Sequence, residues 1–525
     1  MPGFYIGNLT SDYIISDKYT KTLYRDTKYN NFMFEQNTIN KFLDDKCLYE
    51  DSSFIVVLEG YLLNKKILFE QYKTDNVGKL SINMYHSIGD AFFSLFRGGF
   101  SGAIYDKTKN RLIAYTNQTG EAALFYYFKD NKLFVGSRLQ YITGALKKFD
   151  ISYSFNEDAA YQMLTYAFMI DDSTFVKEIK RLQAGNYIVY ENDTLKHCRY
   201  HEFKHNFDKL KALSEEQIIE ELDKKFRDAI KLEYEKDNEY SYTHLVDMSG
   251  GLDSRMTAWV AHDMGIKHLQ LITYSKGNYY DELIAKDIAK YWKDEFIFKQ
   301  LDDASFIYDI ELNTYLLNGL SLYSGITGGR QLLDSLAIDK YGLEHTGMIG
   351  DVVLGSFCRS MNDYENHLPS GKYSERLSIK YNNETPWNEK RIYDDQDLYL
   401  LYSRGMQGAA NTELLRQNYT EVSSPFMHVD FFQFCMDIPI ELRINHYIYK
   451  KWIISKYPEA ARFPWEKTGA RITDSNFKRQ LIRLKRRGKD RLKKALNSQY
   501  VSPNNMNPLD YWYSNDKEMQ DALEK

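Results

Sequence analysis

The sequence contains few cysteines, few prolines and no long apolar run. Its four cysteines are widely separated and form no CxxC pair, which excludes a disulfide framework and a cysteine-rich zinc site. Only 9 prolines and 29 glycines occur in 525 residues, so long flexible linkers are not expected. No apolar run approaches the roughly 20 residues that a membrane-spanning helix needs. The start, MPGFYIGNLTSDY, has no basic segment followed by an apolar one, so no secretory signal is visible and we expect a cytoplasmic protein.

An excess of charge is also absent from the chain as a whole. The net charge is -5 and the isoelectric point is near 6.2. The overall charge therefore does not attract nucleic acid, and no nucleic-acid partner is expected. Hydrophobic residues make up 43% and charged residues 27%, which is the balance of a folded protein. At about 150 residues per domain, the chain is long enough for several domains.

Residues 1–205 alternate short strands with polar turns. A buried strand is expected at Phe54–Leu63, and helices are expected at 82–96 and 157–167. Three hairpins are expected across polar turns, namely 100–106 with 111–116, 123–128 with 132–136, and 186–190 with 195–200. This pattern indicates a β-rich α+β domain.

The pattern changes in residues 206–525, which we predict to form a second domain. Ser214 followed by Gln217 is typical of a capping box, and a helix follows it. The expected elements then alternate as strand 243–248, helix 255–264, strand 268–274, helix 282–292 and strand 295–300. Alternating apolar strands and helices predict an α/β fold with a parallel sheet covered on both faces.

The most informative stretch joins the first of these strands to its helix. It reads Ser249-Gly250-Gly251-Leu252-Asp253-Ser254. Glycines allow the backbone to approach an oxyanion closely, and the start of the helix offers free N–H groups. A carboxylate at Asp253 is repulsive beside phosphates unless it holds a cation such as Mg²⁺. The loop has no lysine and differs from the GxxxxGK[ST] loop of kinases.

The loop resembles the SGGxDS loop of ATP pyrophosphatases, which cleave ATP between the α and β phosphates. Further segments resemble the asparagine synthetase and β-lactam synthetase family: EHTGMIGDVVLGS at 344–356, YTEVSSPFMHVD at 419–430, and WEKTG at 465–469. The order GGFSGAIYD, LIAYTNQTGEAALFYY, LFVGSRLQYI and LQAGNYIV is similar to the amidotransferase domain of the same family. The resemblance reaches from the start to about residue 475.

This resemblance implies an N-terminal Ntn-hydrolase-like sandwich of the class II amidotransferase type, followed by an ATP-pyrophosphatase domain. It implies ATP and Mg²⁺ as cofactors, and a small or carrier-bound carboxylate with ammonia or an amine as substrates. A homodimer is also compatible with it. The residues it assigns to the nucleotide are Ser249, Gly250, Gly251, Asp253, Ser254, Thr346, Gly347 and Lys451. Asp253 and Asp351 are assigned to the metal, and Lys467 to catalysis.

The N-terminal half departs from the family at the residues that use glutamine. The family has a cysteine directly after the first methionine, and this sequence has Pro2. The family's NGEIYN strand, whose Asn and Glu hold glutamine, aligns with Glu59-Gly60-Tyr61-Leu62-Leu63-Asn64, so both ligands are replaced. Release of ammonia from glutamine needs a nucleophile, so we predict that this chemistry is absent.

A second departure is Met348, where the family has a Glu or a Tyr near the attacking amine. Methionine cannot move a proton. Glu421, a substrate carboxylate or an amine that arrives neutral is expected to fill this role. Aspartate is therefore not favoured as the substrate.

The one run of charge lies at 477–497, where ten lysines and arginines are interleaved with leucines. Two interpretations are open: a solvated helix on a large domain, or a helix that docks on an anionic carrier or membrane surface.

The leading hypothesis is an AMP-forming carbon-nitrogen ligase that adenylates a carboxylate. A tRNA-modifying enzyme with the same loop and a catalytically impaired scaffold are the alternatives. Asp253, Asp351 and Lys467 occur together, which argues against the scaffold.

Overall fold

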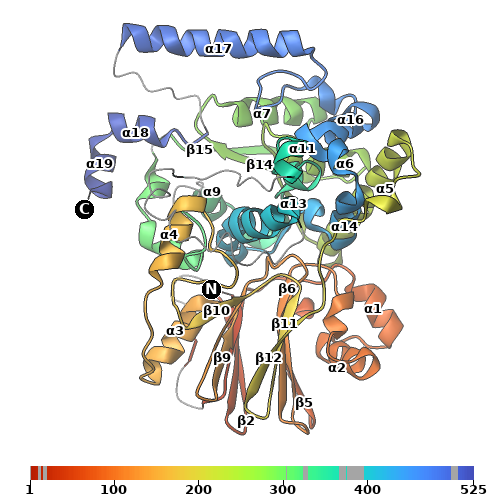
Figure 1. The fold of residues 1–525 in the computed structure, drawn as a ribbon, viewed down its shortest axis with the longest axis vertical. Coiled ribbons are helices and arrows are strands. Elements are labelled where there is room, and N and C mark those ends of the chain that lie inside the picture. Colours follow the sequence, from red (N-terminus) through yellow and green to blue (C-terminus); the bar gives the residue numbers. More distant parts are fainter. Residues whose placement is uncertain are drawn as a thin grey trace.

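The protein has two parts, stacked along its long axis (Figure 1). The structure is a computed structural model, and it describes the chain except residues 1, 10–13, 16–20, 303, 323–328, 366–373, 375–394, 498–505 and 525. The N-terminal part is a β-sandwich, drawn in red to yellow at the bottom of Figure 1, and the C-terminal part lies above it.

The sandwich consists of two six-stranded antiparallel sheets. The first has the order β10-β8-β9-β1-β3-β2, with strands β1 (Gly3–Gly7), β2 (Leu23–Tyr29), β3 (Phe32–Thr38), β8 (Leu124–Lys129), β9 (Lys132–Gly136) and β10 (Ile179–Leu182). The second has the order β12-β11-β7-β6-β5-β4, with strands β4 (Cys47–Glu50), β5 (Phe54–Gly60), β6 (Phe100–Asp106), β7 (Arg111–Thr116), β11 (Asn186–Glu191) and β12 (Thr194–Arg199). The three predicted hairpins are confirmed as β6–β7, β8–β9 and β11–β12.

Three hydrophobic cores make the N-terminal part a four-layer structure. One core lies between the sheets, where Phe34 of the first meets Val57 of the second. A second lies between β5 and helices α1 (Lys65–Tyr72) and α2 (Val77–Ile88). A third lies beneath α3 (Leu139–Lys148) and α4 (Glu157–Tyr166). Successive side chains of a strand point to opposite faces of its sheet, so one strand contributes to two cores in this arrangement.

The predicted helix at 82–96 is wrong at both ends. The helix α2 begins at Val77, because Asn76 caps it by accepting a hydrogen bond from the Lys79 backbone N–H at 3.0 Å. It ends at Ile88, because Gly89 has a φ of 80°, a conformation that stops a helix. A short 3-10 turn, Phe92–Leu95, follows separately.

The C-terminal part contains a five-stranded parallel sheet of order β15-β14-β13-β16-β17. Its strands are β13 (Thr243–Asp247), β14 (Leu269–Ser275), β15 (Phe296–Gln300), β16 (Tyr341–His345) and β17 (Val422–Ser423). The predicted capping box is present: Ser214 and Gln217 open helix α5 (Glu215–Glu239). Helices α6 (Asp253–Asp263) and α7 (Tyr280–Trp292) provide the crossovers between β13, β14 and β15. The predicted alternation of strands and helices is therefore confirmed.

The C-terminal part contains further helical elements. Apart from short 3-10 turns, those among the described residues are α8 (Ile310–Leu316), α9 (Gly329–Asp334), α10 (Gly350–Val353), α11 (Met361–Glu365), α13 (Gln396–Leu400), η8 (Leu401–Gly408), η9 (Ala409–Asn418), α14 (Val429–Asp437), α15 (Ile440–Arg443), α16 (Tyr447–Lys456), α17 (Asn476–Leu496), α18 (Leu509–Asn515) and α19 (Lys517–Leu523). Among the described residues, no helix has both the length and the apolar character to cross a membrane.

The two parts share a buried interface near the predicted boundary at 205. Phe203 already packs in the core of the C-terminal part, and Leu317 and Leu414 pack in the core under α3. Charges are buried here too: the Asp45 carboxylate lies 2.5 Å from Lys65 Nζ and 3.0 Å from Lys236 Nζ. Lys236 belongs to the C-terminal part and Asp45 to the N-terminal part, so separating the parts would break a buried ion pair and leave the Lys236 ammonium without this partner.

Candidate functional site

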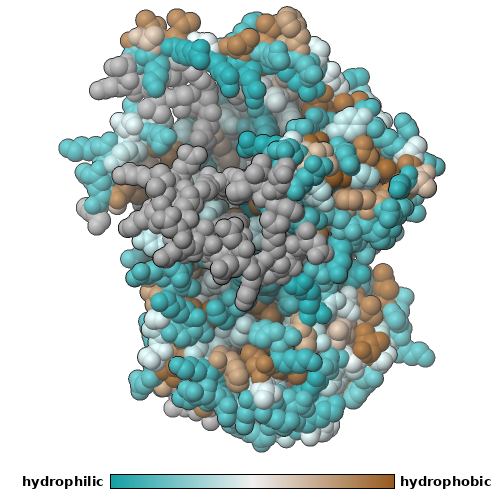
Figure 2. All heavy atoms as spheres, in the orientation of Figure 1, coloured by the Kyte–Doolittle hydropathy of each residue, from teal (hydrophilic) through white to brown (hydrophobic). Residues whose placement is uncertain are grey.

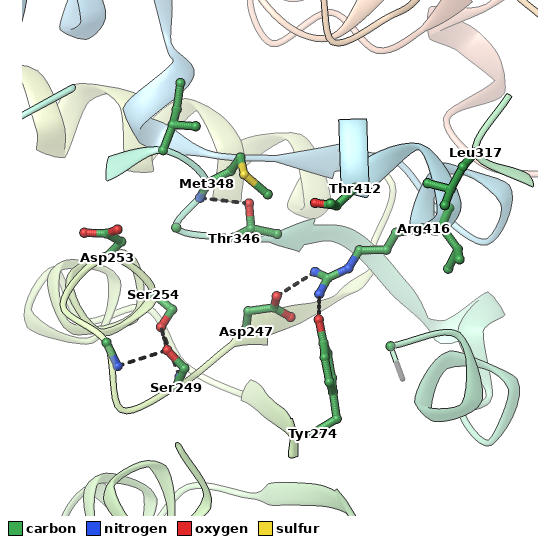
Figure 3. A pocket seen from close by; sticks show the side chains of 15 residues that line it. Asp247, Ser249, Asp253, Ser254, Tyr274, Leu317, Thr346, Met348, Thr412 and Arg416 are labelled. Carbon is green, nitrogen blue, oxygen red and sulfur yellow. Dashed lines mark hydrogen bonds and ion pairs between the residues drawn. The ribbon is translucent and has the colours of Figure 1, made fainter. Parts of the chain in front are cut away.

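The predicted phosphate loop lies at the carboxyl end of β13, where α6 begins, and its own hydrogen bonds hold it closed (Figure 3). The Ser249 backbone N–H donates to Ser254 Oγ at 3.0 Å, and the two serine hydroxyls lie 2.7 Å apart. The Gly250 N–H donates to Asp281 Oδ1 at 2.8 Å, and buried Arg255 donates to the Gly250 carbonyl at 3.0 Å. The loop is thus tied to α6 through Ser254 and Arg255, and to α7 through Asp281.

A cavity of about 320 Å³ opens over this loop. It is lined by Asp247, Ser249, Gly251, Asp253, Ser254, Tyr274, Leu317, Gly329, Thr346, Gly347, Met348, Ile349, Thr412, Leu415 and Arg416. The carboxyl edge of a parallel sheet is where ligands of such folds bind. The structure thus brings six predicted nucleotide residues (Ser249, Gly251, Asp253, Ser254, Thr346 and Gly347) into one cavity, and Gly250 lies in the same loop.

The segment of the second predicted metal ligand, Asp351, contacts the first, Asp253, which lines this cavity. The Asp351 backbone N–H donates to Asp253 Oδ2 at 3.0 Å, and the Tyr449 hydroxyl donates to Asp253 Oδ1 at 2.9 Å. Burial, together with the nearby Asp351 carboxylate, raises the pKa of Asp253 well above its usual value. Two carboxylates that repel one another in a partly buried place fit a divalent cation.

Two glycines, Gly347 and Gly350, allow the segment with Asp351 to lie close to Asp253. A Cβ atom on Gly347 would lie 2.2 Å from the Ser254 nitrogen, and one on Gly350 would lie 2.9 Å from the Asp253 carboxyl carbon. Any side chain at these positions would push the segment with Asp351 away from α6. The glycines of the segment 346–350 therefore have a steric role that the motif alone does not state.

The cavity contains charged groups that motif comparison did not single out. Arg416 donates to Asp247 Oδ2 at 2.6 Å and to Glu344 Oε1 at 2.7 Å, and it also donates to the Tyr274 hydroxyl (Figure 3). The Thr346 hydroxyl donates to Glu413 Oε1 at 2.7 Å, and burial raises the pKa of Glu413 to about 7. The sequence offered no signal for this group, because its members come from β13, β14, β16 and η9.

Lys467 lies close to the site, outside the set of residues that line the cavity. Its side chain is exposed and its ammonium lies 5.4 Å from the centre of the Trp465 ring. The positive charge acts on Asp253, whose pKa it lowers against the larger effects above. The loop that carries Lys467 is tied to the phosphate loop, because the Glu466 backbone N–H donates to the Gly250 carbonyl at 3.0 Å.

Two predicted site residues are not brought to this cavity. Lys451 lies on α16 with its side chain about half exposed, and its ammonium pairs with Glu215 at 3.4 Å. Glu421 is buried, and its carboxylate lies 2.6 Å from Lys46 Nζ of the N-terminal part. Helix periodicity explains why Lys451 does not reach the cavity: it faces α5, while Tyr449, two residues earlier, faces Asp253.

Glu421 instead lines a small pocket of about 40 Å³ between the two parts. This pocket also contains Pro2, Glu59 and Tyr61, the three positions at which the sequence departs from glutamine-using relatives. Lys46 is completely buried and lies between Glu421 and Glu59, 3.4 Å from the latter. Two carboxylates, Glu59 and Glu421, therefore line this pocket, and the buried Lys46 ammonium pairs with both of them.

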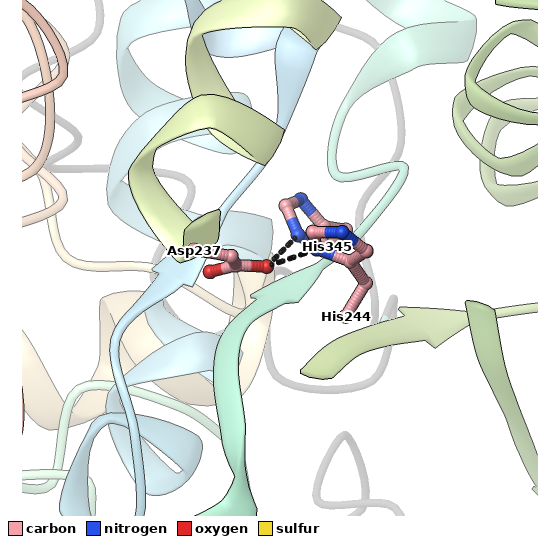
Figure 4. A group of neighbouring side chains, drawn as sticks. All are labelled: Asp237, His244 and His345. Atoms are coloured by element: carbon pink, nitrogen blue, oxygen red, sulfur yellow. Dashed lines mark hydrogen bonds and ion pairs between the residues drawn. The ribbon is translucent and has the colours of Figure 1, made fainter. Parts of the chain in front are cut away.

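Among the described residues, one group of three side chains of the kinds that bind metals lies close together: Asp237, His244 and His345 (Figure 4). Asp237 Oδ2 lies 2.8 Å from His244 Nδ1 and 2.8 Å from His345 Nε2. His345 Nδ1 lies 3.1 Å from Glu233 Oε2. Both nitrogens of His345 face carboxylates, so this is an imidazolium held by two anions rather than a metal ligand.

Residues 46–201 match the family model described as a glutamine amidotransferase domain. The N-terminal part is glutamine amidotransferase-like. Two curated fungal proteins are similar to this chain. The amidase chyE of Penicillium rubens is 25% identical over 225 residues, which make up 41% of this chain and 32% of that protein. The amidase chry2 of Gibberella zeae is 24% identical over 183 residues, which make up 34% of this chain and 26% of that protein. The matched region thus spans about a third or less of these relatives.

The solved structures that are similar to this chain include two with low TM-scores. The glutamine phosphoribosylpyrophosphate amidotransferase of B. subtilis, complexed with ADP and GMP, has 11% identity and a TM-score of 0.22, and the match covers 47% of this chain and 53% of that one. An allosteric regulatory enzyme of purine biosynthesis has 7% identity and a TM-score of 0.26, with 57% and 74% covered.

Proposed function

We propose that the protein is an ATP-dependent ligase that forms amide bonds without using glutamine. A carboxylate oxygen of the substrate would attack the α phosphorus of ATP and release pyrophosphate. Ammonia or an amine would then attack the acyl carbon, lose a proton and release AMP. The observation that carries this proposal is the meeting of Asp253 with the Asp351 segment directly beside the SGGLDS loop.

The residues present fit such a nucleotide. The hydroxyls of Ser249 and Ser254, and the N–H groups at the start of α6, offer donors to phosphate oxygens. The carboxylates of Asp253 and Asp351 would hold Mg²⁺, which supplies charge neutralisation for the departing pyrophosphate. The exposed Lys467 ammonium acts electrostatically on Asp253, so we expect it to approach the α phosphate of a bound nucleotide.

The second pocket supports the absence of glutamine use. The described residues that line it include no cysteine. The nearest cysteine in sequence, Cys47, is buried in the core under α2, and burial raises the pKa of its thiol to about 12. A thiol with so high a pKa is not a nucleophile near neutral pH.

ATP–pyrophosphate exchange tests the proposal. Purified protein with Mg²⁺, ATP, labelled pyrophosphate and a panel of carboxylic acids should return label to ATP only when the correct acid is present. The complete reaction should yield AMP. ADP as the main nucleotide product would contradict the proposal. So would hydrolysis of simple amides without ATP, the activity that the name amidase suggests for the fungal relatives.

A further inference from the structure

The helix α17 (Asn476–Leu496) stands apart from both domains, along the upper edge of the molecule in Figure 1. It has 21 residues, and Ser475 caps it by accepting a hydrogen bond from the Lys478 backbone N–H at 3.3 Å. Of the side chains that the structure describes in this helix, none is buried. A helix normally gains most of its stability by burying one face. Because no described side chain of α17 is buried, no other part of the described chain covers a face of this helix.

One side of α17 is a stripe of exposed apolar side chains. The exposed fractions are 71% for Phe477, 41% for Leu481, 63% for Leu484, 65% for Leu492 and 85% for Leu496. The first four, with Gly488 and Ala495, recur at steps of three or four residues, which places them on one face. Figure 2 shows the corresponding brown side chains along the upper edge of the molecule.

The rest of α17 is cationic. The helix contains ten lysines and arginines and one acidic residue, Asp490, in a chain whose net charge is -5. On a helical wheel, Lys478 and Lys485 flank the apolar stripe on one side, and Arg487 and Arg491 flank it on the other. An apolar stripe between two rows of cations is the pattern of a helix that lies in the interface of an anionic bilayer.

We infer that α17 docks the protein on a membrane surface that contains anionic lipids. A second copy of the helix would cover the leucines, but it would bring two strongly positive surfaces together. A soluble polyanion would pair the cations and leave the leucines in water. Only a surface that is apolar inside and anionic outside satisfies both features of the helix.

The helix follows the Lys467 loop closely in sequence, and its first turn is tied to the segment between them. Arg479 donates to the Ile472 carbonyl at 2.6 Å, and Lys478 pairs with Asp474 at 2.6 Å. Residue 474 is seven positions after Lys467, whose loop is hydrogen bonded to the phosphate loop. Docking would therefore hold the cavity near the membrane, where a lipid-linked carboxylate or amine could reach it.

Flotation of the full chain with lipid vesicles, in the absence of ATP, tests this inference independently of the proposed reaction. We expect binding to vesicles of phosphatidylcholine with phosphatidylglycerol, much weaker binding to phosphatidylcholine alone, and a loss of binding at high salt. The triple variant Leu481→Gln, Leu484→Gln, Leu492→Gln keeps the charge and should weaken binding by roughly tenfold or more. The variant Lys485→Gln, Arg487→Gln, Arg491→Gln keeps the leucines and should weaken it similarly.

Ile67→Gln is the matched control, because Ile67 is 59% exposed on α1 of the N-terminal part. It should bind vesicles like the wild type, and all variants should keep the wild-type melting temperature because the altered side chains are not buried. Vesicle binding that ignores the leucines, or none at all, would overturn the inference. So would leucine-dependent dimers in sedimentation, or binding to a soluble polyanion without binding to vesicles.

Discussion

At the scale of single residues, Asp253 combines a functional role with an unfavourable environment. Its carboxylate is partly buried beside Asp351, and its pKa is raised for that reason. Asp253→Asn should reduce AMP formation by at least about a hundredfold while leaving the melting temperature without Mg²⁺ unchanged or higher, because it removes a repulsion. Paired activity and thermal-unfolding measurements check this. A melting temperature that falls together with activity would mean that Asp253 is structural.

Lys467 is a second residue whose role is testable in isolation. If its ammonium stabilises charge on the α phosphate, Lys467→Met should lower the turnover by roughly 100- to 1000-fold with little change in ATP affinity. Lys467→Arg should restore little, because a planar guanidinium is not a compact point charge. Lys451→Met is the matched control, since that lysine pairs with Glu215 on the surface. Equal turnover for the Lys467 and Lys451 variants would assign Lys467 to the solvated surface.

Glu421 is predicted to stabilise the interface rather than to take part in catalysis. Glu421→Ala leaves the buried Lys46 ammonium with Glu59 alone, and it should lower the free energy of unfolding by about 3 to 5 kcal/mol. Glu421→Gln should cost less, because its carbonyl can still accept a hydrogen bond.

Added formate should partly restore the melting temperature of Glu421→Ala, since it can enter the vacated space, and should leave Glu421→Gln unaffected. Denaturant unfolding and thermal scans with and without formate measure both effects. Full stability of Glu421→Ala without formate would show that the ion pair contributes nothing.

At the scale of elements, one imidazolium joins α5, β13 and β16. His345 of β16 contacts Glu233 and Asp237 of α5, and Asp237 also contacts His244 of β13. Burial alone lowers the pKa of His345, but the two carboxylates outweigh it and raise the pKa to about 9. The strand is thus held to the helix by a charge that depends on pH.

The sign of this dependence follows from the raised pKa. The unfolded chain releases the proton near pH 6.5, whereas the folded protein retains it to about pH 9. The charged His345 therefore adds about 3 kcal/mol to the free energy of unfolding below pH 6.5. This stabilisation falls as the pH rises and is lost above about pH 9. Urea unfolding of wild type and His345→Gln across this window should show a difference that shrinks as the pH rises. A constant difference would contradict a charged His345.

At the scale of the whole molecule, a glutamine amidotransferase-like domain is joined to a parallel-sheet domain through a buried interface. The pocket at that interface contains Pro2, Glu59 and Tyr61, the three positions at which the sequence departs from glutamine-using relatives. We therefore expect no glutaminase activity: glutamine incubated with the protein should yield glutamate at the rate of the buffer. A coupled glutamate assay checks this, and Pro2→Cys is the informative companion, because it returns a thiol while leaving Lys46 and its two carboxylates in place. A clear glutaminase rate in the wild type would show that the domain has been misinterpreted.

Local sequence patterns determined the elements and their order. The three hairpins and the alternation of strands and helices from β13 to β15 follow from periodicity and turn residues, which act over a few positions. The end of α2 did not follow from periodicity. The apolar pattern continues past Gly89, but the backbone leaves the helical conformation at that residue. The SGGLDS loop was recognisable because all its residues are contiguous.

Only the tertiary structure decided what lies against what. The parallel sheet brings Asp351 to Asp253, and it places Arg416 between Asp247 and Glu344 from separate strands. It also places Glu421, which we expected near the attacking amine, in an ion pair with Lys46, 375 positions away in sequence. Contacts over such separations depend on how strands are ordered in a sheet and how two domains meet. Neither is encoded in residue spacing along the chain.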